Sequence, residues 1–204
     1  MESPADETRG IDNRNFPTVM FLLELHSQCM LLKRAARHLA DDAEHWKLLA
    51  QHIDDGKKAP PIDIVATCTI ALFAVASIKR LLDPCGRNDR RVIKRCANLR
   101  RLLGAPLMPT ISSLSVRDSW EHADERLEAL LRKRQRGVAI SGIYVSADPP
   151  SDGVVLRRFD PVGFTIHYLD DSIPLNLAVV EADLIDERIK EAWVILQREI
   201  VKLY

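Results

Sequence analysis

The sequence predicts a mainly α-helical fold: an antiparallel helical bundle with a small antiparallel β-sheet appendage and a C-terminal helix. Apolar residues recur at spacings of three and four over most of residues 16–136. After Gly137 the apolar period falls to about two and clusters of turn residues interrupt it. The length of 204 residues suits one domain, and the 47% hydrophobic and 28% charged residues are typical of a globular chain.

Two apolar helices are expected in the first part of the chain. The first begins at Phe16, and its period either breaks at Asp41–Asp42 or continues through Trp46. Residues 54–61, which contain one glycine and two prolines, form a loop. The second helix, 62–82, is apolar almost all round, as expected for the centre of a bundle. Its apolar run of about 14 residues is shorter than the roughly 20 that cross a bilayer.

A basic third helix is expected at 89–103, followed by an extended linker around Pro109 and a fourth helix at 113–136. Alternating apolar residues then predict four short strands, and the last helix follows at 183–203. The predicted strands are 138–145, 154–159, 164–169 and 175–180, with a turn at 169–171. We divide the chain into a flexible leader (1–15), a helical bundle (16–136) and a β-hairpin appendage with a C-terminal helix packed on the bundle (137–204), in one structural domain overall.

Charge and cysteine content limit the class of protein. The 29 basic and 29 acidic residues cancel, so nucleic-acid contact requires a local patch rather than a basic field over the whole molecule. The four cysteines are widely spaced, which favours buried free thiols in a reducing cytosol over a zinc site, and no metal or cofactor is expected. The acidic, polar start lacks the features of a secretory signal, so we expect a cytoplasmic protein without membrane contact.

The fourth predicted helix holds the most informative short segment, 115–127. Its apolar positions form one stripe, and helical geometry places Arg117 and His122 on opposite flanks of that stripe, outside the core. One interpretation is a solvated face on which Arg117 pairs with Glu121 at i+4 and His122 is an ordinary exposed residue.

A second interpretation comes from a known family. The segment Arg117-Asp118-Ser119-Trp120-Glu121-His122 resembles the R-x(4–6)-H motif of the HEPN superfamily, and the likeness covers about residues 16–136. The resemblance implies a metal-independent endoribonuclease, a hydrolase that works as a homodimer and acts as a toxin or defence effector. Arg117 would then stabilise the phosphate, His122 would move a proton or orient the 2′-oxygen, and Asp118 would position one of them.

The basic third helix is the predicted RNA-binding surface, although a solvated helix face explains the same charges. Its candidate contacts are Arg90, Arg91, Lys94, Arg95 and Arg101. The alternative function is a non-catalytic HEPN-like module that binds a partner protein, such as an antitoxin, or a nucleotide. The strand region offers a third possibility, pairing with a strand of another protein.

Overall fold

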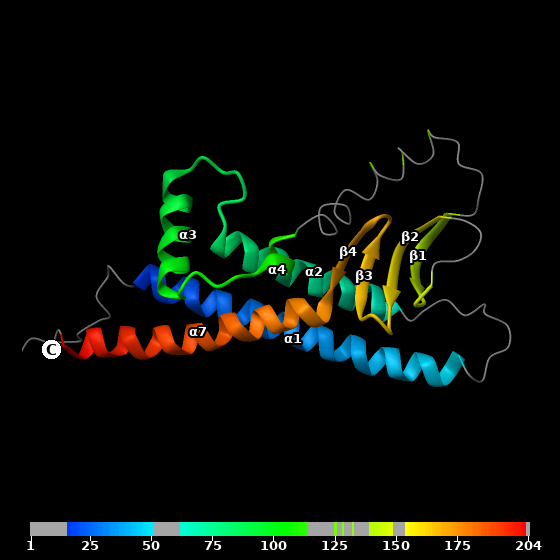
Figure 1. Cartoon of the computed structure of the whole chain (residues 1–204), viewed down its shortest axis with the longest axis horizontal. Coiled ribbons are helices and arrows are strands. Elements are labelled where there is room, and N and C mark those ends of the chain that lie inside the picture. The colour runs from blue at the N-terminus through cyan, green and yellow to red at the C-terminus, as the bar shows by residue number, and fades with distance from the viewer. Residues whose placement is uncertain are drawn as a thin grey trace, which may run out of the picture.

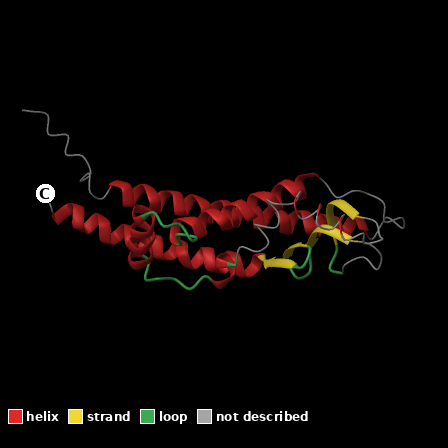
Figure 2. Ribbon diagram, turned by 90° about the horizontal axis from the view of Figure 1, so that it is seen from above, coloured by secondary structure: helices red, strands yellow, loops and turns green. Residues whose placement is uncertain are grey.

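The computed structural model describes residues 16–50, 62–113, 125, 128, 132, 139–148 and 154–202. The described chain is mainly helical, with a small four-stranded sheet and a long C-terminal helix, which confirms the coarse prediction. The helices α1 (Phe16–Ala50), α2 (Ile62–Leu82) and α7 (Leu175–Lys202) lie lengthwise beside one another and give the molecule an elongated shape (Figures 1 and 2). The helix α1 packs against both α2 and α7.

The core follows the predicted helical period. Leu22, Leu25, Leu32 and Leu39 of α1 are fully buried, at spacings that keep them on one face of the helix. The helix α1 continues without a break through Asp41–Asp42, because Ala43, one turn after Leu39, is still buried in the core.

The helix α2 has the predicted bounds, and not all of it is buried. Cys68, Val75 and Ile78 face the core, whereas Phe73 is 52% exposed. The segment Asp63–Leu82 is long and apolar enough to cross a membrane, and fewer than half of the residues in its most apolar window are buried. The core helices of soluble proteins meet the same criteria of length and composition.

The helix α3 (Arg90–Leu102) lies beyond the end of α2, close to the N-terminal end of α1 (Figure 1). The linker after it differs from the prediction. We expected an extended chain around Pro109, but this proline starts a one-turn helix, α4 (Pro109–Ser112). Glu181 of α7 explains the difference, because its carboxylate accepts hydrogen bonds from the backbone N–H groups of Thr110 and Ile111, each at 2.8 Å.

The sheet is mixed, not antiparallel as predicted. Its strands are β1 (Ala139–Val145), β2 (Val154–Asp160), β3 (Thr165–Tyr168) and β4 (Asp171–Pro174), in that order. The strands β1 and β2 pair in parallel, and the other two pairs are antiparallel. Residue alternation shows which side chains share a face but not the direction of the neighbouring strand, so the sequence could not reveal the parallel pair.

The fourth predicted strand, 175–180, is wrong, because these residues form the first turns of α7. Leu175, Ala178, Ala182 and Ile185 are buried at spacings of three and four, and this helical packing overrides the β preference of two adjacent valines. The helix therefore begins at Leu175 rather than at residue 183. The fourth strand is instead β4, which begins inside the predicted turn at 169–171.

Candidate functional site

The three predicted catalytic residues, Arg117, Asp118 and His122, lie outside the described residues. Further along the same predicted helix, Glu125, Glu128 and Arg132 are helical. The Arg132 guanidinium Nη2 lies 3.0 Å from Glu128 Oε2, an exposed i,i+4 ion pair. The arrangement of the Arg117–His122 motif therefore stays a prediction.

The predicted RNA-binding side chains lie on α3. Asp89 caps the helix, since its carboxylate accepts a hydrogen bond of 2.8 Å from the Arg91 backbone N–H. Cys96 and Leu99 are buried on the opposite face. Four of the five predicted contacts are exposed, and the described residues supply no hydrogen bond or ion pair to their side chains; they are Arg90, Arg91, Lys94 and Arg101.

Arg95, the fifth predicted contact, points into the molecule. Its guanidinium lies over the Phe21 ring of α1, 4.9 Å from the ring centroid, and donates a hydrogen bond of 3.0 Å to the Arg80 carbonyl of α2. The Arg95 Nε atom is buried without a partner. This side chain therefore joins α3 to the two long helices.

A polar network that the sequence did not reveal joins α1 to α7. Asp186 of α7 is 4% exposed, and its Oδ1 accepts a hydrogen bond of 2.5 Å from His26 Nδ1. Its Oδ2 lies 3.1 Å from Lys33 Nζ and 3.2 Å from Lys190 Nζ. Lys33 also pairs with Asp183 at 3.1 Å. The two helices are thus held together by charges as well as by apolar packing.

Burial and hydrogen bonds shift the pKa values of Asp186 and of the nearby Cys29 thiol. Burial would raise the pKa of Asp186, but the hydrogen bonds from His26, Lys33 and Lys190 outweigh burial and lower it. Burial raises the pKa of the nearby Cys29 thiol to about 12, and the Asp186 carboxylate acts in the same direction. Cys29 is therefore a protonated core thiol rather than a nucleophile.

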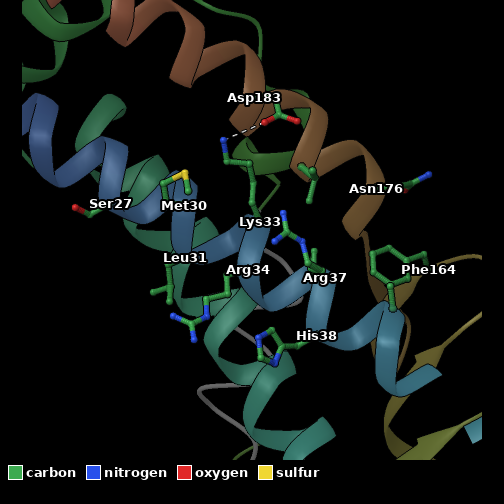
Figure 3. Close-up of a pocket in the computed structure, with 13 residues that line it drawn as sticks. Ser27, Met30, Leu31, Lys33, Arg34, Arg37, His38, Phe164, Asn176 and Asp183 are labelled. Carbon is green, nitrogen blue, oxygen red and sulfur yellow. Dashed lines mark ion pairs between the residues drawn. The ribbon is translucent and has the colours of Figure 1, made fainter. Parts of the chain in front are cut away.

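A groove of about 980 Å³ lies along the seam between α1 and α7. Figure 3 shows that the basic side chains that line it come from α1, while Phe164 and Asn176 line it from the side of the sheet and α7. The principal lining residues are Lys33, Arg34, Arg37, His38, Phe164, Asn176 and Asp183. The cationic positions of α1 are visible in the sequence, but their partners lie more than 120 residues away and no sequence pattern joins them.

The sheet holds an arginine–histidine pair. Arg158 of β2 and His167 of β3 are cross-strand partners, and Arg158 Nη2 lies 3.0 Å from His167 Nε2. Arg158 also donates hydrogen bonds to the carbonyls of Ser146 and Ala147. Burial, followed by the Arg158 charge, lowers the pKa of His167, so a neutral imidazole that accepts the arginine N–H accounts for the contact. This pair fixes the end of β1 against β2.

Within the described part of the chain, no group of three or more His, Cys, Asp and Glu side chains is placed to hold a metal ion. Comparison with known proteins gives no further assignment: no family model, no curated protein and no solved structure matches this chain. The functional assignment therefore depends on the residues themselves.

Proposed function

We propose that the protein is a HEPN-like helical bundle that binds RNA through α3 and cleaves it without a metal ion, as a homodimer. The observation that carries the proposal is the exposed cationic face of α3. Arg90, Lys94 and Arg101 lie within about 40° of one another around the helix axis, and Arg91 lies beside them. In a chain of zero net charge, such a concentration of cations without a partner among the described residues favours an anionic polymer as ligand.

The length of this face suits a nucleic-acid backbone. From Arg90 to Arg101 the helix rises about 16 Å, enough to contact more than one phosphate of a single strand. Arginine also donates two parallel hydrogen bonds to a phosphate, which lysine does not. The side chains lie on one rigid helix, which reduces the entropy lost on binding.

The cleavage step is proposed from the Arg117–His122 motif. A histidine has a pKa near neutrality and can take the proton of a ribose 2′-hydroxyl, while a guanidinium stabilises the charge that grows on the attacked phosphate. The 2′-oxygen bonds to phosphorus, the 5′-oxygen of the next nucleotide leaves, and that oxygen receives a proton. In a two-fold dimer each site would draw on two copies of the motif.

The cleavage proposal is tested by incubating the purified protein with several classes of RNA in EDTA. We expect Arg117→Ala and His122→Ala each to reduce cleavage at least 100-fold. Arg132→Ala is the matched control, because it removes an exposed cation of the same predicted helix and should retain cleavage. Absence of cleavage by the wild-type protein with every RNA class, or cleavage unaffected by both variants, would contradict the proposal.

The binding part has its own test, the salt dependence of RNA affinity. Replacement of Arg90, Lys94 and Arg101 by alanine should reduce the slope of log affinity against log salt by about two for a single strand. Arg188→Ala removes a cation that is paired with Glu191 on α7 and should leave the slope unchanged. Equal slopes for the triple variant and the wild type would exclude α3 as the interface.

A non-catalytic interaction module remains the second candidate, and the surface of α2 favours it. Ile70 and Phe73 are one turn apart and are 42% and 52% exposed, which gives α2 an apolar surface suited to a protein partner. Under this function the wild-type protein cuts no RNA. Arg117→Ala and His122→Ala would then be silent, each within about 0.5 kcal/mol of the wild-type free energy of unfolding.

A further inference from the structure

The groove between α1 and α7 is lined by two arginines and an aromatic ring, which take no part in the RNA contact proposed for α3. We propose that it binds one nucleotide of an unpaired RNA strand, with the base against Phe164 and the phosphate at Arg37. The inference rests on the proposed RNA function and names its substrate class, single-stranded rather than double-stranded RNA.

The charges of the groove favour an anion. Lys33 is already neutralised, because its ammonium group pairs with Asp183 and Asp186, each at 3.1 Å. Arg34 and Arg37 are exposed, and in the described part of the structure neither has an ion pair or hydrogen bond from its side chain. The two guanidinium groups are therefore left for a ligand. Their i,i+3 spacing places the two residues on neighbouring turns of α1.

Phe164 is held in an unusual conformation at the other side of the groove. Its φ of +48° lies in the left-handed region, which a bulky residue rarely adopts. The turn before it is fixed by Asp160, whose Oδ1 accepts hydrogen bonds of 2.8 Å from Val162 N and Gly163 N. The Phe164 carbonyl in turn accepts 2.9 Å from Leu175 N, the first residue of α7. Hydrogen bonds before and after Phe164 in the chain thus hold the backbone that carries its ring.

The Phe164 ring combines a packed side with an accessible one. It makes a T-shaped contact with Phe159, with ring centroids 5.8 Å apart, and packs against the core. It is only partly buried and lines the groove. Figure 3 shows Arg37 nearer than Arg34 to Phe164, with the Arg37 guanidinium on the side of α1 that faces α7 and the Arg34 guanidinium directed away from it. An aromatic ring beside a cationic track is the usual arrangement for binding unpaired bases.

Asn176 supplies a polar group on the same side of the groove as Phe164 (Figure 3). Its Oδ1 accepts a hydrogen bond of 2.9 Å from Leu177 N, which holds the side chain against the start of α7. The volume of about 980 Å³ is large enough for a nucleotide and its neighbours. In a duplex the base would be stacked and paired, and the ring could not reach its face.

The test measures adenosine 5′-monophosphate and ribose 5-phosphate binding by ligand-observed NMR, because these two probes differ only in the base. We expect the wild-type protein to bind the nucleotide at least fivefold more tightly than the sugar phosphate, the lower end of the roughly 5- to 150-fold effect of one base–aromatic stack. Phe164→Leu should abolish this difference and Phe164→Tyr should restore it. Arg37→Ala should weaken both probes, whereas Arg188→Ala, the matched charge control, should weaken neither.

Equal affinities for the two probes, or an unchanged preference in Phe164→Leu, would overturn the proposal and leave a simple anion site. The failure of the proposed function would look different. If the protein neither cuts RNA nor depends on α3 for binding, but the nucleotide still binds through Phe164, the groove is a nucleotide site and the ribonuclease is refuted. The Arg90, Lys94 and Arg101 triple variant should retain the nucleotide affinity within twofold.

Discussion

The buried carboxylate of Asp186 gives the sharpest prediction about stability. The variant Asp186→Asn keeps the size of the side chain but removes the charge that faces Lys33, His26 and Lys190. The Lys33 side chain is only 19% exposed, so water replaces little of the interaction that it loses with the carboxylate. The side chains of His26 and Lys190 are 42% and 68% exposed, and water compensates most of the interaction that they lose. Breaking a buried pair costs roughly 3–5 kcal/mol, and we expect a value near the lower end, about 3 kcal/mol.

Thermal and urea unfolding measure this cost. For a chain of this length, about 3 kcal/mol corresponds to a fall in Tm of roughly 6–12 °C at pH 7. Asp183→Asn is the matched control: Asp183 is 55% exposed and pairs with the same Lys33, so its replacement should cost no more than about 1 kcal/mol. If Asp186→Asn costs no more than Asp183→Asn, burial does not strengthen this network and the reasoning fails.

Three further predictions concern a histidine of the sheet, the cysteines and a glutamate of α7. Because burial and Arg158 lower the pKa of His167, the unfolded chain binds its proton more tightly; the free energy of unfolding should fall as pH decreases below about 6.5, and His167→Gln should remove this dependence in urea titrations. A thiol reagent should label only the exposed Cys85 in the native protein and all four cysteines in urea; rapid native labelling of Cys29 would contradict its burial. Glu181→Ala leaves the N–H groups of α4 without an acceptor and should cost about 1–3 kcal/mol in chemical denaturation, whereas Glu191→Ala should be nearly silent.

The sequence predicted those helices whose apolar residues recur at spacings of three and four. The bounds of α2 and the presence of the basic helix α3 were correct, because each helix buries a stripe of apolar residues against its neighbours. The parallel pairing of β1 and β2 could not be predicted, since it depends on the path of the connection and not on residue alternation. The inward position of Arg95 was equally hidden, because the Phe21 ring that it covers belongs to another helix.

Besides the long sequence separation of its two sides, an error in secondary structure hid the groove. A strand at 175–180 separates Asn176 from the final helix, so Asp183 and Asp186 seem to begin that helix rather than to lie two or three turns inside it. Once α7 begins at Leu175, the helix lies along α1 from its first turn, and its acidic residues reach Lys33. The same packing draws the Phe164 turn to α1, through the hydrogen bond between the Phe164 carbonyl and Leu175 N. The start of α7 therefore determines both which α1 cation is neutralised and which two guanidinium groups remain for a ligand.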